Sequence, residues 1–197
     1  DRSLEILNRI ECDRVRDRLV DRIYRMVRSR GNWHQQERLA NALLQFNDSD
    51  STTEEFNNIK AKALLAEVAL NQENYQKTRD LSRETLEAIE HFHKKPENFK
   101  FSDFSEYLNA PQSDHFKSQE STHLEYEIDP YTLTTLKSLE NLANYSFGIA
   151  KYHLNKADEA IQHLETALQQ SDPQIDLKLH LDSLAGLQKI YYEQKRY

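Results

Sequence analysis

The sequence of 197 residues contains few helix-breaking residues, with three glycines and four prolines. Glycine and proline are the residues least compatible with a helix interior, so their scarcity leaves long stretches in which a helix can continue. Charged residues make up 30% of the chain and hydrophobic residues 38%. This balance is typical of helices that bury one face and expose the other. The sequence therefore predicts an all-α protein.

Cysteine and long apolar runs are also scarce, and each absence excludes a class of protein. The single cysteine, Cys12, cannot form an internal disulfide, which agrees with a reducing compartment. No stretch reaches the roughly 18 apolar residues of a membrane-spanning helix. The first residues, DRSLEILNRIECDR, lack the apolar core of a signal peptide. We therefore expect an intracellular protein, cytoplasmic or nuclear, that does not insert into a membrane.

The charge is distributed unevenly along the chain: acids are in excess overall, but arginines are in excess near the N-terminus. The net charge of −7 argues against a general nucleic-acid binder, yet the first thirty residues contain nine arginines against six acids. Four of the arginines follow helical spacing: Arg14, Arg18, Arg22 and Arg25. One interpretation is a solvated helix face with intrahelical ion pairs. The other is a basic strip that binds an acidic peptide, a phosphate group or RNA.

Groups that would perform catalysis do not converge in the sequence. The glycines stand singly, which excludes a glycine-rich phosphate loop. His91 and His93 are two residues apart and would lie on different helix faces, whereas metal ligands on a helix are three or four apart. His163 is expected to be a partly buried residue between helices. We expect no enzymatic activity, no metal site and no cofactor.

Three short polar turns, RGN, NQEN and NK, interrupt the helical pattern. Each precedes an anchor residue, and a fourth anchor ends the chain: Trp33, Tyr75, Ala157 and Tyr197. The anchors are 42, 82 and 40 residues apart, and 82 is close to twice 41. The residues ten and seven positions before the anchors are all apolar: Ile23, Leu65, Phe147, Leu187, Met26, Val68, Ala150 and Ile190. The sequence therefore predicts a structural repeat of about 40 residues.

Two helices joined by so short a turn must lie antiparallel, and stacked hairpins extend one core along the array. We expect the first helices of the hairpins at residues 13–30, 53–70, 130–154 and 173–194. The second helices are expected at residues 33–46, 74–93 and 156–170. Pro130 and Pro173 are suited to a first helical turn.

Gly148, Ala160, Ala167-Leu168 and Asp172-Pro173 follow a pattern that resembles the tetratricopeptide repeat (TPR) family. The segments LQKIYYEQKRY and ALLAEVALNQENYQKTRDLSRETL resemble it too, although Gln36 replaces a small residue expected in the first unit. The period of about 40 is longer than the usual 34 and is similar to that of kinesin light chains. The resemblance covers about two thirds of the chain. It implies a right-handed helical-hairpin solenoid, a TPR-like superhelix of three to four hairpins with a long central insertion loop.

The chain then divides into three parts. Residues 1–93 would form N-terminal TPR-like hairpins, and residues 130–197 a C-terminal hairpin plus the first helix of a truncated repeat. Residues 94–129 are an insertion loop or a degenerate repeat, whose aromatic residues either pack on the array or bind a partner. Because the chain starts with Asp and ends within a helical pattern, we expect it to be a segment of a longer protein.

In TPR arrays the first helices line a concave groove. The resemblance therefore implies a protein–protein interaction scaffold, a segment of a multi-subunit assembly, that binds a peptide or a helix of another protein in the groove. One alternative is a regulatory module that senses a peptide or recruits an enzyme, and another is an RNA-binding repeat that uses the arginine strip. The groove residues implied as partner-binding are Tyr145, Ile149, Tyr152, Lys189, Tyr192, Arg25, Arg28 and Glu67.

Overall fold

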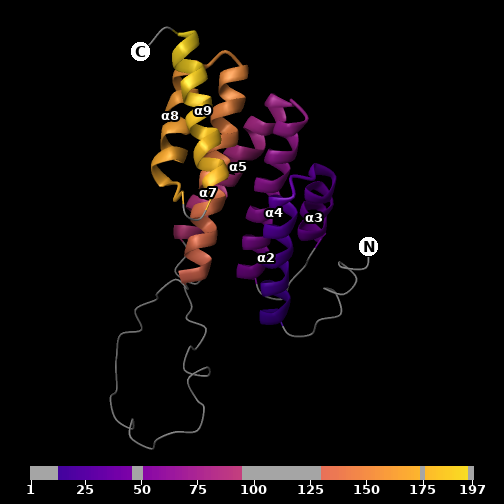
Figure 1. Ribbon diagram of the computed structural model, residues 1–197. Helices are drawn as coiled ribbons and strands as arrows, with labels where there is room; N and C mark the ends of the chain where they lie inside the picture. The colour runs from indigo at the N-terminus through magenta and orange to yellow at the C-terminus, as the bar shows by residue number, and fades with distance from the viewer. Residues whose placement is uncertain (1–12, 46–50, 95–129, 174–175, 195–197) are drawn as a thin grey trace, which may run out of the picture.

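The computed structural model describes residues 13–45, 51–94, 130–173 and 176–194 of the chain (Figure 1). Within these ranges the regular elements are α-helices and there is no strand, so the prediction of an all-α protein is confirmed. The helices are α2 (Asp13–Ser29), α3 (Trp33–Gln45), α4 (Ser51–Asn71), α5 (Tyr75–Lys94), α7 (Pro130–His153), α8 (Ala157–Gln170) and α9 (Leu177–Glu193). None of these helices is long and apolar enough to cross a membrane.

The RGN, NQEN and NK turns between helices contain the three described residues with left-handed backbone. Gly31 has a φ of 62°, Glu73 of 58° and Asn155 of 60°. A residue in this conformation ends a helix because it turns the chain out of the helical path. In the first two turns an asparagine then caps the next helix: Asn32 Oδ1 accepts from the backbone N–H of Gln35, and Asn74 Oδ1 from that of Lys77, each at 3.2 Å.

The predicted helix boundaries agree with the observed ones within two residues, except at the start of α9. Pro173 was expected in the first turn of this helix, and that expectation is wrong. The helix begins at Leu177 because Asp176 is its N-cap, with Oδ1 accepting from the backbone N–H of Leu179 at 3.1 Å. An aspartate cap satisfies a terminal N–H group, whereas a proline in the first turn only avoids having one.

Helices that follow one another in the chain also approach each other in space, from α2 to α9. In addition, α4 approaches α7, and α7 approaches α9, which are the expected first helices of successive hairpins. Figure 1 shows α4 and α7 side by side, with α9 beside α7. The packing between helices is therefore mainly between neighbours along the chain.

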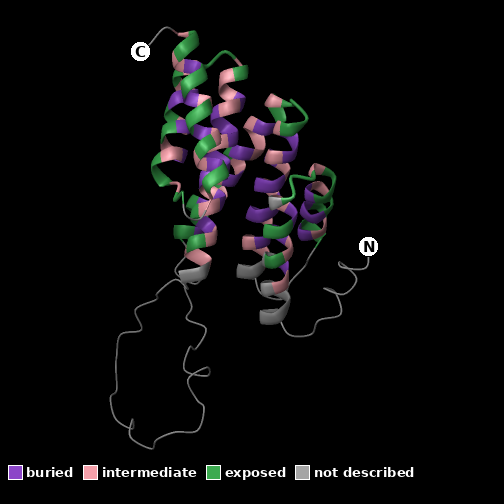
Figure 2. Cartoon of the chain, viewed as in Figure 1, coloured by how far each residue is buried: buried purple, intermediate pink, exposed green. Residues whose placement is uncertain are grey.

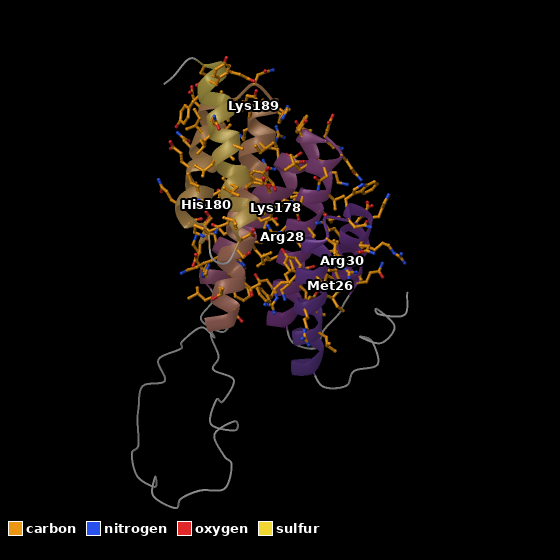
Figure 3. All side chains as sticks on the ribbon, viewed as in Figure 1. Met26, Arg28, Arg30, Lys178, His180 and Lys189 are labelled. Carbon is orange, nitrogen blue, oxygen red and sulfur yellow. The ribbon has the colours of Figure 1, made fainter. Side chains whose placement is uncertain are left out.

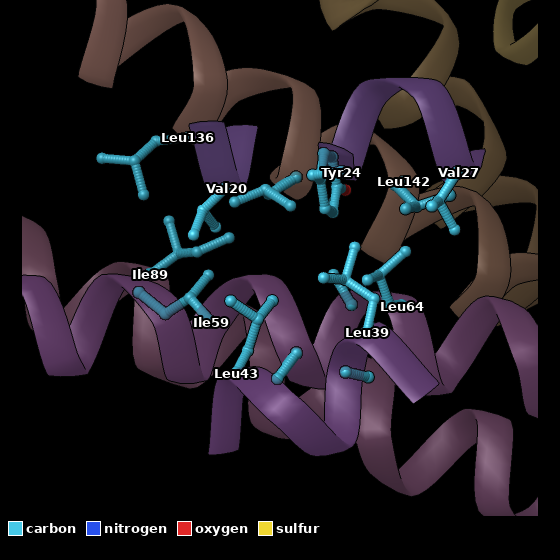
Figure 4. Packing of buried hydrophobic residues seen from close by; sticks show 14 of the residues in the cluster. Val20, Tyr24, Val27, Leu39, Leu43, Ile59, Leu64, Ile89, Leu136 and Leu142 are labelled. Carbon is cyan, nitrogen blue, oxygen red and sulfur yellow. The ribbon is translucent and has the colours of Figure 1, made fainter. Parts of the chain in front are cut away.

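The larger of two hydrophobic clusters joins α2, α3, α4, α5 and α7, together with Leu179 of α9. Figure 4 shows Val20, Tyr24 and Val27 of α2 above the side chains of α3 and α4. The smaller cluster joins α8 to α9 through residues such as Leu164 and Ile190. Figure 2 shows the buried residues where helices meet and exposed residues on the outward faces.

The apolar repeat positions are buried in α7 and α9, but Met26 in α2 is 45% exposed. The reason lies in what the position faces. Its equivalent in α9, Ile190, packs in the cluster that contains Ala160 and Leu164 of the preceding helix. For Met26 the comparison ends there, because α2 is the first helix among the described residues.

Some predictions fall on parts of the chain that the structure does not describe. The segment 94–129, interpreted as an insertion loop or a degenerate repeat, lies outside the described residues except for Lys94, which ends α5. The side chains of Arg14 and Arg18 also lie outside them.

Candidate partner-binding surface

The residues predicted to bind a partner come from four helices. Arg25 and Arg28 lie on α2 and Glu67 on α4. Tyr145, Ile149 and Tyr152 lie on α7, and Lys189 and Tyr192 on α9. Figure 3 places Arg28 beside the start of α9 and Lys189 near its other end. We call Arg28 and Glu67, with the polar groups they bind, the inner group. Tyr152, Lys189 and Tyr192 form an outer group at the surface.

The inner group centres on Arg28, which links three helices. Its Nη1 donates to Asp176 Oδ2 at 2.9 Å, and its Nε lies 3.6 Å from Glu67 Oε2. Gln36 Nε2 donates to the same Glu67 oxygen at 3.2 Å. The side chains of Arg28 and Glu67 are each only 16% exposed. These two predicted partner-binding residues therefore bind each other and the start of α9.

The electrostatics of this inner group reflect its burial. Burial raises the pKa of Glu67, and the nearby Arg28 guanidinium opposes the rise without cancelling it. Burial acts to lower the pKa of Arg28, but neighbouring groups that include Glu67 and Asp176 outweigh it, and the net direction is upward. The arginine therefore stays charged, while the carboxyl group of Glu67 takes up a proton more readily than an exposed glutamate does.

Tyr145 and Ile149 belong to the packing between helices more than to the surface. Tyr145 packs against both hydrophobic clusters. Burial, together with the Asp182 and Glu67 carboxylates, raises the pKa of its phenol to about 12. Ile149 packs against the smaller cluster, and its Cδ1 lies 3.1 Å from where a Cβ on Gly186 would stand. Truncation of either side chain would therefore test stability before it tested binding.

The outer group lies where the C-terminal ends of α7 and α9 meet. Tyr152 Oη donates to the Glu193 carboxylate, and Lys189 Nζ lies 5.0 Å from the centre of the Tyr152 ring. The hydrogen bond to Glu193 raises the pKa of Tyr152 to about 12, with burial as a lesser cause. Tyr192 is 70% exposed. We call Tyr152, His153, Lys189, Tyr192 and Glu193 the tyrosine–lysine surface.

A stacked pair of rings connects this surface to α5. The His153 ring lies parallel to the Tyr75 ring, with an interplanar angle of 2° and centroids 4.0 Å apart. The Tyr152 ring meets the same histidine edge-on at 5.1 Å. Partial burial and then the Lys189 ammonium lower the pKa of His153, so the ring is neutral at pH 7. A neutral imidazole suits this stacked position, since no charge is desolvated there.

The remaining sequence candidates lie on α2, α5 and α8. Arg22 and Arg25 are exposed on α2, so two members of the proposed arginine strip face solvent. His91 Nδ1 lies 3.0 Å from Glu55 of α4. His163 is half-buried with its Nδ1 3.0 Å from Asn144 Oδ1, which confirms its expected place between helices. Among the described residues no group of three or more His, Cys, Asp or Glu side chains could hold a metal ion.

Sequence reasoning missed Asp176 and Gln36, which complete the inner group around Arg28 and Glu67. For Gln36 a signal existed, because it stands where the repeat pattern expects a small residue. For Asp176 the available signal was that aspartate is a favourable N-cap residue and that Asp176 directly precedes the helical pattern starting at Leu177. No protein-family model, curated protein or solved structure matches this chain.

Proposed function

We propose that the chain is a protein–protein interaction scaffold, built as a TPR-like right-handed solenoid, and a segment of a larger assembly protein. Its helices approach mainly their neighbours in the chain, and its expected first helices α4, α7 and α9 approach in succession, which supports a solenoid. Nothing among the described residues favours the regulatory or the RNA-binding alternative.

The tyrosine–lysine surface is the observation that carries this proposal. Three residues implied as partner-binding, Tyr152, Lys189 and Tyr192, come from two helices yet meet at one end of the array. Tyrosine combines a large apolar ring with a polar hydroxyl and is frequent among residues that dominate binding energy. The Lys189 ammonium adds a cation that is 5.0 Å from the centre of a ring. Such a surface suits a peptide or helix that carries apolar and acidic side chains.

The proposed binding surface is smaller than the whole row of first helices. Arg28 and Glu67 form an ion pair, and Tyr145 is part of the packing. A partner at these positions would first have to break contacts within the protein. We therefore place the partner over the C-terminal ends of α7 and α9.

The test is a pull-down from cell extract with quantitative mass spectrometry, comparing the parent with Tyr152→Ala/Tyr192→Ala and with Lys189→Ala. Lys137→Ala is the matched control for the lysine, because Lys137 is exposed on α7 at the other end of that helix. We expect the specific partners to be depleted about tenfold or more by the tyrosine variant, a loss of about 1.4 kcal/mol of binding energy. Unchanged recovery of every partner in both variants would refute the proposal.

A further inference from the structure

The hairpin of α2 and α3 is more open than the two other hairpins among the described residues. The backbones of α4 and α5, and likewise those of α7 and α8, approach each other at many positions, whereas those of α2 and α3 approach at few. The helix α3 lies closer to α4 than to α2. In the first hairpin, therefore, the first helix does not pack closely on the second.

The residues at the helix crossing explain the difference. A Cβ atom on Gly148 of α7 would lie only 3.1 Å from the carbonyl oxygen of Ala160 in α8. The first hairpin carries Tyr24 and Gln36 at these two register positions, and both side chains are buried. Because the distance between packed helices depends on the side chains at their crossing, two such large residues keep α2 away from α3.

The helix α2 packs instead on the first helices of the later hairpins. Its residues that belong to the larger cluster or pack against it form one stripe: Leu19, Val20, Ile23, Tyr24 and Val27. The same cluster contains Leu136 and Leu142 of α7. Figure 4 shows Val20, Tyr24 and Val27 together with these two leucines.

Arg28 continues this face at the end of α2 and reaches two further helices. Its guanidinium donates to Asp176 at the start of α9 and lies 3.6 Å from the Glu67 carboxylate of α4. One face of α2 thus combines an apolar stripe with a cation that meets two carboxylates.

The opposite side of α2 is exposed, at Arg22, Arg25 and Met26. In α4, by contrast, Ile59 and Ala61 are completely buried on nearly opposite sides of the helix. A helix that is buried on one face makes fewer apolar contacts than one that is buried on both. It therefore opens at a lower free energy than the helices around it.

The turn after α2 allows this helix to move without α3. Gly31 has a φ of 62°, and beyond its chain neighbours no described atom lies within 4 Å of where its Cβ would stand. Asn32 caps α3 by accepting from the backbone N–H of Gln35, a bond that involves no residue of α2. The first turn of α3 therefore keeps its cap when α2 moves away.

We infer that the faces of α4, α7 and the start of α9 beneath α2 form a helix-binding site with α2 as its occupant, and that α2 leaves this site as one unit while α3 to α9 stay folded. We define this α2 site by Glu67, Leu136, Leu142 and Asp176. It fits a helix whose apolar residues recur at i, i+4 and i+7 and are followed by an arginine, which is the pattern of α2. The site lies at the start of α9, whereas the tyrosine–lysine surface lies at its other end.

Hydrogen exchange of the whole chain at pH 7, followed amide by amide by NMR, tests whether α2 opens as a unit. We expect the amides of residues 19–29 to share one opening equilibrium, with an open fraction at least tenfold larger than that of α4 and α7. Exchange of α2 through the same opening as α4 and α7, or through a different opening for each amide, would overturn the inference.

A second test asks whether the uncovered α2 site binds α2 as a separate peptide. A fluorescein-labelled peptide with the sequence of α2, Asp13–Ser29, is titrated with the whole chain carrying Val20→Asp/Val27→Asp, and binding is followed by fluorescence anisotropy. We expect saturable binding that is at least tenfold tighter than to the parent. In the parent the chain's own α2, joined by a short turn, competes at a high effective concentration. A peptide that carries the same two substitutions should not bind.

The matched control is Arg22→Ala/Met26→Asp, which makes the same change in charge on the exposed side of α2. We expect this control to bind the peptide as weakly as the parent does. Adding Tyr152→Ala/Tyr192→Ala to the valine variant should leave peptide binding unchanged, which separates this site from the tyrosine–lysine surface. Equal binding to the parent and the valine variant, absent binding, or loss of all helix content in the valine variant by circular dichroism would each contradict the inference.

Discussion

Substitution of Gly148 by alanine tests the helix pairing on which the register rests. In the middle of an exposed helix, this change normally stabilises a protein by about 0.5–1 kcal/mol, because glycine loses more backbone entropy on folding. Gly148 is buried against α8, and its new Cβ would lie 2.7 Å from Leu164 Cγ. We therefore expect the opposite sign, a loss of stability.

The magnitude follows from which atoms are in the way. Leu164 Cγ is a branch point, not a free end, and the Ala160 oxygen at 3.1 Å is part of the backbone of α8. Neither moves by rotation of a flexible terminus, so the two helices must separate. Overpacking of this kind costs about 1–3 kcal/mol, and the gain in helix propensity offsets part of it. We expect a net loss of about 1–2 kcal/mol, equal to a fall in Tm of about 2–8 °C for a chain of this size.

The matched control is Gly186→Ala in α9, measured by urea unfolding beside Gly148→Ala. Its Cβ would meet Ile149 Cδ1 at 3.1 Å and Leu164 Cδ1 at 3.2 Å, which are terminal methyl groups able to turn away. We expect a change within about 0.5 kcal/mol of the parent, since the contact and the propensity gain oppose each other. If Gly148→Ala were as stable as Gly186→Ala, α8 would not cross α7 at this glycine, and the reasoning would fail.

Two further predictions concern the inner group. Arg28→Met should destabilise the protein by about 2–3 kcal/mol in urea unfolding, below the roughly 3–5 kcal/mol of a fully buried pair, because Glu67 and Asp176 lose their shared cation; an unchanged midpoint would contradict this. Because the folded-state pKa of Glu67 is raised above its ordinary 4.5, the folded state binds the proton more tightly. Protonation of Glu67 therefore stabilises the folded state fully below pH 4.5, and this contribution to the unfolding free energy is lost as the pH rises through the folded-state pKa. Glu67→Gln should remove this fall from the pH profile of unfolding free energy, and a slope equal to the parent's would show that another group causes it.

The helices could be predicted from the sequence because their signals are local. The RGN and NQEN turns contain the glycine or polar residues that adopt left-handed backbone and the asparagines that cap α3 and α5. Apolar periodicity between such turns leaves little freedom in where a helix lies. The start of α9 was missed because Pro173 and Asp176 are both favourable starting residues, and only the side-chain hydrogen bond of Asp176 decides between them.

The candidate site could be predicted only in part, because its contacts depend on how distant elements approach. Tyr152, Lys189 and Tyr192 were expected on one surface because the resemblance to TPR arrays implies that first helices such as α7 and α9 line one groove. Arg28 and Asp176 are separated by 148 residues, and no period in the sequence brings the end of α2 to the start of α9. The sequence predicted the helix face on which Arg28 lies, but it did not predict that Asp176 contacts Arg28 there.

The departures from the repeat, more than the repeat itself, mark the specific contacts. Gln36 stands where a small residue was expected, and its side chain is buried and donates to Glu67. A small residue there would leave Glu67 with Arg28 alone and open space between α3 and α4. In α9, Leu181 and Leu184 depart from the buried asparagines at the equivalent positions of α7 in the opposite direction, toward greater hydrophobicity on an exposed face. Singly exposed leucines are common on protein surfaces, so this departure by itself identifies no partner. The comparison of equivalent positions thus identifies Gln36 as a contact that is specific to this chain and satisfied inside it.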